Sequence, residues 1–131
     1  MRKIIFLLFM FFCVTATISL AQDITHPSNE KSDKYTWDFG YVKQSQISKH
    51  DFILKNDSNK LLVIKSVNTS CGCTASKAKK ETLSPGETTD IEVSFNSKGY
   101  SGEVKQYIYV HTDNLDNETI RFIIKANVVK E

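Results

Sequence analysis

Hydrophobic and polar residues alternate along most of the chain after its first 34 residues, which is the pattern of half-buried β-strands. The clearest run is 88–96, where Ile91, Val93 and Phe95 are separated by polar residues. A second run, 119–129, predicts one apolar face made of Ile120, Phe122, Ile124, Ala126 and Val128. No stretch in this part of the chain has the length and period of an ordinary amphipathic helix, so the pattern predicts an all-β domain.

Four further runs are expected to be strands: 35–39, 50–55, 61–67 and 104–112. The first is expected to stop at Gly40. The last predicts two different faces, with Ile108 and Val110 inward and Tyr107, Tyr109 and His111 outward. Polar turns separate the runs, the strongest being Ser84-Pro85-Gly86-Glu87.

About seven short strands in roughly 100 residues, with turns about every 8 to 12 residues, predict an immunoglobulin-like antiparallel β-sandwich. Such sandwiches are often joined by a disulfide between the sheets. Apart from Cys13, the chain has only Cys71 and Cys73, which are too close in sequence to join two sheets. We therefore expect this sandwich to be held together by packing.

The first 21 residues have the features of a secretory signal peptide. Arg2 and Lys3 precede the apolar run 4–12, and Ser19-Leu20-Ala21 ends the segment with small residues around a larger one. Cleavage is expected after Ala21. The alternative is a retained membrane anchor, but residues 4–20 are shorter than the roughly 20 apolar residues that span a bilayer.

The predicted organisation is a signal peptide (1–21), a flexible spacer (22–34) and one sandwich domain (35–131). Lipid anchoring at Cys13 is not expected, because bulky phenylalanines precede it. The whole chain has 17 Lys and Arg against 15 Asp and Glu, and cleavage would leave 15 of each. A neutral domain gives no electrostatic reason to expect nucleic acid or an anionic membrane as partner.

The candidate chemistry lies in Ser70-Cys71-Gly72-Cys73-Thr74. In an extended strand the two cysteine Cα atoms would be roughly 6.5 to 7 Å apart, at the limit of disulfide geometry. Gly72 allows backbone conformations that would shorten this distance. In an oxidising compartment we expect a Cys71–Cys73 disulfide with Gly72 as the supporting turn residue.

Four other interpretations of the cysteines stay open. The disulfide could exchange with other thiols, and nearby Lys77, Lys79 and Lys80 are the only candidates for lowering a thiol pKa. The thiolates could hold a metal with His26, His50 or His111, although the spacing is unlike that of structural zinc sites. One cysteine could act as a nucleophile with a histidine base, or both could be inert buried thiols.

Several motifs together resemble a known family. The segments that carry the resemblance are Trp37-Asp38-Phe39-Gly40, Phe52-Ile53-Leu54-Lys55-Asn56, Ser70-Cys71-Gly72-Cys73-Thr74, Pro85-Gly86-Glu87, Phe95 with Gly99 and Gly102, and the final isoleucine-rich strand. They resemble the secreted bacterial family catalogued as domain of unknown function 1573, which is similar to Hydin-like and major-sperm-protein-like immunoglobulin modules. Trp37 stands where a different aromatic residue is expected, which is a small departure from the family's pattern. The resemblance implies this fold and an extracytoplasmic location, and no established activity.

The function expected from the sequence is that of an exported, non-enzymatic module. It is expected to bind another exported protein, an envelope component or a glycan through sandwich loops or an exposed strand edge. Tyr100, Tyr107 and Tyr109 are its candidate binding surface, for sugars or peptide. The alternative is a small thiol-redox or metal-handling protein centred on Cys71 and Cys73. No catalytic residue, cofactor or resident metal is expected, and the partner, the oligomeric state and the choice between periplasm and exterior stay open.

Overall fold

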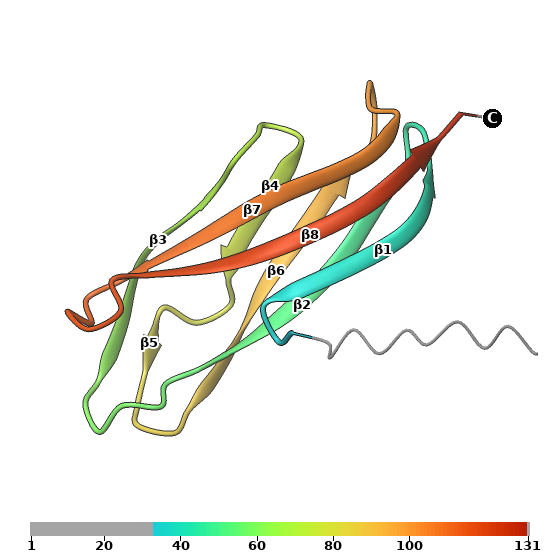
Figure 1. The fold of residues 1–131 in the computed structure, drawn as a ribbon. Coiled ribbons are helices and arrows are strands. Elements are labelled where there is room, and N and C mark those ends of the chain that lie inside the picture. The colour runs from blue at the N-terminus through green and yellow to red at the C-terminus, as the bar shows by residue number, and fades with distance from the viewer. Residues whose placement is uncertain (1–32, 131) are drawn as a thin grey trace, which may run out of the picture.

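The structure is a computed structural model that describes residues 33–130. Its regular structure consists of eight strands (Figure 1): β1 (Thr36–Lys43), β2 (Ile47–Lys55), β3 (Leu62–Thr69), β4 (Thr74–Ala78), β5 (Thr82–Leu83), β6 (Thr88–Asn96), β7 (Gly102–Thr112) and β8 (Thr119–Val129). The predicted signal peptide, the cleavage after Ala21, Cys13, His26 and nearly all of the predicted spacer lie outside the described residues. Within residues 33–130, no helix is long and apolar enough to cross a membrane.

The strands form a sandwich of two sheets. One sheet has five strands in the order β1-β8-β7-β3-β5, and the other has three in the order β2-β6-β4. The predicted immunoglobulin-like β-sandwich is confirmed. All strand pairs are antiparallel except one, because the edge strand β1 runs parallel to β8. In Figure 1, β7, β8 and β1 lie in front of β6 and β2.

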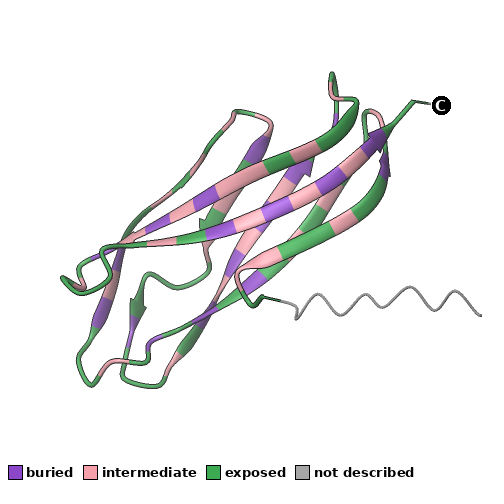
Figure 2. Cartoon of the chain, in the orientation of Figure 1, coloured by how far each residue is buried: buried purple, intermediate pink, exposed green. Residues whose placement is uncertain are grey.

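The core lies between the sheets and follows the predicted alternation. Buried and less buried residues alternate along β6, β7 and β8 (Figure 2). The predicted inward residues of these strands are buried with the exception of Ile120, which is half-buried. The fully enclosed side chains include Phe95 and Phe122, each with no exposed surface. Burial of this apolar surface is the main stabilising contribution expected in a sandwich without an inter-sheet disulfide.

Two local predictions are wrong. The first strand does not stop at Gly40 but continues to Lys43, because one extra residue between Asp38 and Tyr41 forms a bulge in the pairing with β8. Gly40 adopts a φ of +66° there, and its amide donates to Asp38 Oδ1 at 2.8 Å. Strand β4, directly after Cys73, had no counterpart among the predicted strands.

An aromatic row crosses the seam between the edge strands β1 and β2, which belong to different sheets. Trp37 of β1 stacks on His50 of β2, and His50 contacts the edge of Phe52. Phe52 in turn stacks on Phe122 of β8, with ring centroids 4.7 Å apart. The aromatic row fills the middle of the seam between β1 and β2. It does not reach the end of the seam near Lys55, where the pocket described below lies.

Candidate functional site

The cysteine pair lies in the turn between β3 and β4. The structure places the Sγ atoms of Cys71 and Cys73 together as a disulfide, with the Cα atoms 5.4 Å apart. The turn is closed by the Thr74 amide, which donates to the Cys71 carbonyl oxygen at 3.4 Å. The contraction expected at Gly72 is present, but Gly72 has no positive φ, and a Cβ atom there would meet nothing within 4 Å. A special glycine conformation is therefore not what shortens the distance.

Tyr100 belongs to this cysteine turn. It lies between β6 and β7, and its hydroxyl donates to Cys73 Sγ at 3.1 Å. Its ring packs edge-on against Phe95, with centroids 5.8 Å apart. The three tyrosines predicted as one binding surface are therefore divided between two places, because Tyr107 and Tyr109 face outward on β7.

The histidines lie in other surroundings than the cysteines. His50 is stacked in the aromatic row, and His111 contacts Thr119 Oγ1 at 3.0 Å through Nδ1. Within residues 33–130, no three His, Cys, Asp or Glu side chains are grouped so that they could hold a metal ion. The structure thus brings neither histidine to Cys71 and Cys73 as a third ligand or as a base.

The three lysines considered as possible activators of a thiol are paired with carboxylates. Lys77 lies 3.2 Å from Glu92, Lys79 lies 2.8 Å from Asp90, and Lys80 pairs with Glu87. The hydrogen bond and charge of Asp90 raise the pKa of Lys79. These exposed ion pairs contribute little to stability, and they direct the lysine charges toward the carboxylates of β6 and of the turn before it.

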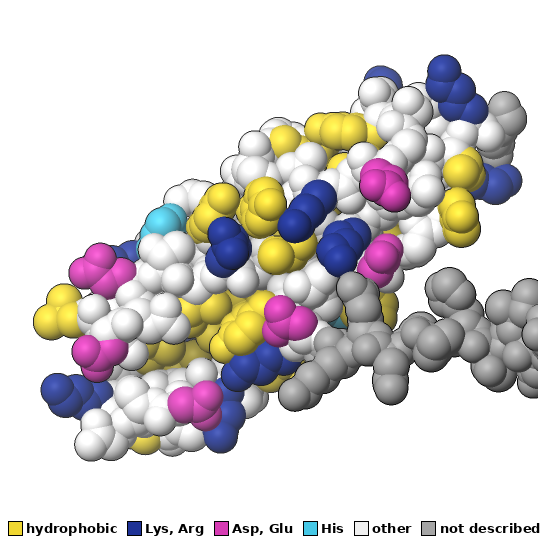
Figure 3. Space-filling model, in the orientation of Figure 1, with side chains coloured by type: hydrophobic (Ala, Val, Ile, Leu, Met, Phe, Trp, Pro, Cys, Tyr) yellow, Lys and Arg dark blue, Asp and Glu magenta, His cyan; other side chains and the backbone are white. Residues whose placement is uncertain are grey.

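The outer face of the five-stranded sheet carries tyrosines next to cations. The rings of Tyr107 and Tyr109 lie 6.3 Å apart at 27°. Lys105 Nζ and Arg121 Cζ lie 5.6 and 5.5 Å from the centre of the Tyr107 ring, in the range of cation–π contacts. Figure 3 shows hydrophobic and basic side chains side by side across the middle of this face, over β7 and β8.

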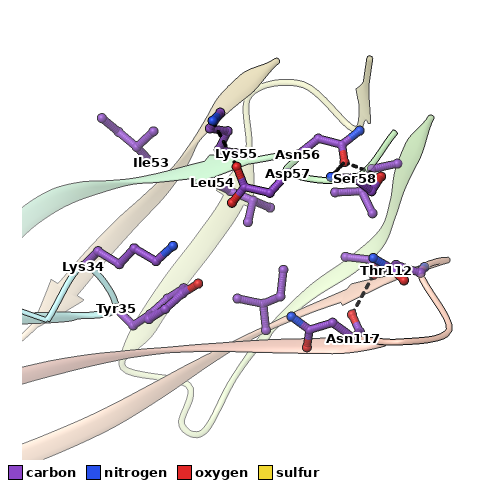
Figure 4. Close-up of a pocket in the computed structure, with 13 residues that line it drawn as sticks. Lys34, Tyr35, Ile53, Leu54, Lys55, Asn56, Asp57, Ser58, Thr112 and Asn117 are labelled. Carbon is purple, nitrogen blue, oxygen red and sulfur yellow. Dashed lines mark hydrogen bonds and ion pairs between the residues drawn. The ribbon is translucent and has the colours of Figure 1, made fainter. Parts of the chain in front are cut away.

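A pocket of about 620 Å³ opens at the end of the seam between the sheets. Its walls come from the end of β2, the turn before β1, and the β7–β8 connection. Figure 4 shows Leu54 pointing into the space opposite Tyr35, while Ile53 points away from it. Leu62 and Ile120 add apolar surface, while Lys34, Lys55 and Asp57 add charged groups at its walls. The pocket can therefore receive an apolar side chain against its apolar part, with polar groups of the ligand at the charged walls.

Beside the pocket, β2 has a free backbone edge. Its nine residues pair with β6 without a bulge, and no other described strand pairs with it. The Asn56 amide donates to the Glu87 carbonyl at 2.9 Å, and the Ser97 amide donates to the Gln46 carbonyl at 2.9 Å. Because hydrogen-bonded pairs alternate in an antiparallel ladder, the even-numbered residues of β2 bond to β6 and the odd-numbered ones point their N–H and C=O groups outward.

The sequence indicated the cysteine pair, the outward tyrosines and an exposed strand edge in general, but not that this edge belongs to β2 or that a pocket lies beside it. The alternation in 50–55 was a signal for a one-sided strand. Whether this strand lies at the edge or in the middle of its sheet depends on pairing between distant segments of the chain. No local sequence pattern therefore indicates the free edge.

A model of one protein family matches residues 31–128, which is most of the chain, and its description is protein of unknown function (DUF1573). The chain belongs to this family. The resemblance noted in the sequence is confirmed by this match. The comparison with curated proteins found no match.

Solved structures share the fold of this DUF1573 domain. A protein of unknown function from Porphyromonas gingivalis W83 has a TM-score of 0.64 and 16% identity, over 71% of this chain and 44% of that chain. The VesB protease of Vibrio cholerae has a TM-score of 0.60 and 13% identity, over 70% of this chain and 30% of that chain. The ASH/PapD-like domain 7 of human CEP192 has a TM-score of 0.58 and 11% identity, over 76% and 84%.

These similarities concern the fold alone, because the sequences are so different. The DUF1573 domain spans less than half of the first of these structures and less than a third of the protease. By contrast it covers 84% of the PapD-like domain of CEP192. The comparisons thus establish family and fold.

Proposed function

We propose that the protein is an exported, non-enzymatic interaction module that binds an extended peptide segment of another exported or envelope protein along the edge of β2. The observation that carries this proposal is the nine-residue, unbulged edge of β2, whose odd-numbered backbone groups have no strand partner among residues 33–130. Such an edge is a template for one more strand, because main-chain hydrogen bonds supply affinity without a particular partner sequence.

A binding role fits the chemistry of the described residues better than catalysis. A hydrolase or transferase needs a nucleophile, a base and an orienting group that converge from separate elements. Among residues 33–130 the cysteines are Cys71 and Cys73, and the described histidines lie elsewhere. The support for a non-enzymatic module is therefore the arrangement of these groups, together with the free edge.

The pocket supplies a side-chain requirement for the bound segment. A strand added to β2 would place alternate side chains toward the interior, and the one opposite Leu54 would face the pocket. Tyr35, Leu62 and Ile120 make that position apolar. We expect a β-branched or other medium-sized apolar residue there, since such residues also favour the extended conformation.

Charge supplies a second requirement. Lys49 points outward from β2 and is exposed, and no acidic residue within the described range forms an ion pair with it. An acidic residue opposite Lys49 on the bound strand would make a favourable cross-strand pair. The expected segment thus has an acidic and an apolar residue on opposite faces, at the same spacing as Lys49 and Leu54.

The test begins with amide hydrogen exchange of the free protein. We expect slow exchange at Ser48, His50, Phe52 and Leu54 and fast exchange at Lys49, Asp51 and Ile53, because only the even-numbered amides bond to β6. Protected odd-numbered amides in the free protein would mean that another part of the chain already occupies the edge, and would contradict the proposal.

Peptides selected from a random display library should then protect the odd-numbered amides. Ile53→Pro removes the N–H that faces the partner while sparing the ladder with β6, so it should weaken peptide binding about tenfold or more with little loss of stability. Ile53→Thr is the matched control, because it removes the same exposed side chain but keeps the amide. Equal binding by both variants would contradict strand addition.

A second candidate function, thiol exchange at Cys71 and Cys73, is favoured by one contact, the hydrogen bond from Tyr100 to Cys73 Sγ. A double Cys71→Ser, Cys73→Ser variant separates the two functions. If the protein is an interaction module, this variant keeps its peptide binding. If thiol exchange is the function, the variant loses all activity.

A further inference from the structure

The two sulfur atoms of the cysteine turn have unequal surroundings. Cys73 is anchored, because its carbonyl accepts a hydrogen bond from the Asn96 amide at 2.9 Å and its side chain packs against the hydrophobic core. Cys71 lies in the bend that follows β3 and is not part of that core cluster. Both cysteines are half-buried, and Cys71 is the one whose side chain is not packed against the core, so it is the less hindered of the two.

Hydrogen bonding adds to this asymmetry. The Tyr100 hydroxyl donates to Cys73 Sγ at 3.1 Å. Tyr100 is held in place by Phe95 against its ring, and by its own backbone, since its amide donates to the Ser97 carbonyl at 3.1 Å and its carbonyl accepts from Gln44 Nε2 at 3.1 Å. A donor fixed in this way stabilises negative charge on the sulfur that it faces, because hydrogen bonds to charged acceptors are the stronger ones.

The donors near Cys71 give less stabilisation to that sulfur as a leaving group. The Cys73 amide donates to Cys71 Sγ at 3.3 Å, a longer contact than the 3.1 Å of Tyr100 with Cys73 Sγ, and it comes from within the same small turn. The Thr74 hydroxyl lies 3.7 Å from Cys71 Sγ and 3.6 Å from Cys73 Sγ, so it favours neither. Tyr100 comes from a separate turn, between β6 and β7, and is anchored there by contacts outside the cysteine turn.

We propose that the disulfide reacts with thiols in one direction, with attack at Cys71 and departure of Cys73. A thiolate of a low-molecular-weight thiol forms a new bond to Cys71 Sγ as the bond between the two cysteine sulfurs breaks. The electron pair of that bond leaves on Cys73 Sγ, where the Tyr100 hydroxyl stabilises the thiolate until solvent protonates it. The incoming thiol is oxidised to the mixed disulfide and Cys73 is reduced.

This direction assigns a role to each of three residues and rests on the second candidate function. Cys71 is the site at which the mixed disulfide forms, and Cys73 is the leaving and resolving thiol. Tyr100 is a positioning donor, because it acts through Cys73 and not on the incoming thiol. Glutathione is a suitable probe because its single thiol can form a mixed disulfide but cannot close a ring of its own.

The experiment treats the oxidised protein with glutathione, quenches with acid within the first turnover, alkylates the freed thiol, and maps both labels by mass spectrometry. We expect glutathione on Cys71 and the alkyl group on Cys73. In Tyr100→Phe, which keeps the ring against Phe95, the rate of opening should fall about three- to tenfold and the share of glutathione on Cys73 should rise. The matched control is Tyr109→Phe, which removes a hydroxyl from the outer sheet face.

The outcomes are separable. If glutathione forms no mixed disulfide at either cysteine, thiol exchange itself fails as a function, and the proposed direction fails with it. If glutathione is found mainly on Cys73, or if Tyr100→Phe reacts like the wild-type protein, exchange stands and the proposed direction is overturned. Equal slowing in Tyr100→Phe and Tyr109→Phe would also overturn the role of Tyr100.

Discussion

The indole ring of Trp37 stacks on the imidazole ring of His50, with centroids 4.0 Å apart and planes 6° from parallel. The two residues come from the edge strands of different sheets, so this stack holds the seam of the sandwich together. His50 also meets the edge of Phe52 at 4.6 Å. Burial among these rings lowers the pKa of His50, and the charge of Asp51 opposes the shift only in part.

The lowered pKa of His50 predicts a loss of stability in mild acid. The unfolded chain takes up a proton near pH 6.5 while the folded protein resists it, so the free energy of unfolding is at its full value above that pH and falls as the pH drops toward the lowered pKa. Urea unfolding between about pH 7 and 5 measures this slope. His50→Phe keeps a stacked ring and should flatten the curve. Identical slopes in both proteins would contradict this assignment, because the two proteins differ only at His50.

Replacement of Asn56 is expected to cause a large loss of stability that is specific to this residue. It is 1% exposed, and its side-chain amide donates to the carbonyl oxygens of Lys60 at 2.8 Å and Leu83 at 2.9 Å. Asn56→Ala leaves these acceptors without a donor, so it should lower the free energy of unfolding by about 2 to 4 kcal/mol. Asn59→Ala, in the same loop but exposed, should change it by less than about 0.5 kcal/mol. Similar losses in the two variants would show that Asn56 is not a structural anchor.

Two glycines predict opposite effects of the same substitution. Gly40→Ala places a side chain on a residue with φ +66° and should cost about 1 to 2 kcal/mol. Gly72→Ala meets no atom within 4 Å and no positive φ, so it should be neutral or stabilise by up to about 1 kcal/mol. Thermal unfolding of both variants measures the difference. A larger loss at Gly72 would mean that the cysteine turn needs glycine after all.

The Cys71–Cys73 disulfide is expected to contribute only modestly to the stability of the domain. A disulfide that closes so short a loop removes little entropy from the unfolded chain. The double serine variant should therefore stay folded and lose less than about 2 kcal/mol of unfolding free energy, measured in urea. A loss of cooperative unfolding would instead make the disulfide a structural requirement.

The sequence predicted most accurately the bounds of those strands in which large apolar and polar residues alternate. The bounds of β6 and β8 agree with the predicted 88–96 and 119–129, because large apolar residues alternate along them and face the core. Strand β4 was missed because its inward residues are Thr74, Ser76 and Ala78, which are small or polar and carry no hydrophobic signal. Gly40 was interpreted as an end, since its role in a bulge depends on the pairing with β8.

The candidate sites were predicted to different degrees for the same reason. Cys71 and Cys73 are neighbours in the chain, so their proximity could be inferred from the sequence. The contact of Cys73 with Tyr100 joins residues on two different turns, and no local pattern indicates it. The free edge of β2 and its pocket depend on where β1 pairs, which is set by contacts across the whole domain.

The parallel pairing of β1 with β8 also has a mechanical consequence. Thr36 lies beside Ile123 and Lys43 beside Val129, so the start of β1 and the end of β8 lie toward opposite ends of the paired strands. A force that pulls these two ends apart acts along the strands and loads the hydrogen bonds between β1 and β8 together, in shear. In this geometry the hydrogen bonds between β1 and β8 must break together and cannot open one after another from one end. The pairing of β1 with β8 is therefore expected to resist tension applied between the start of β1 and the end of β8.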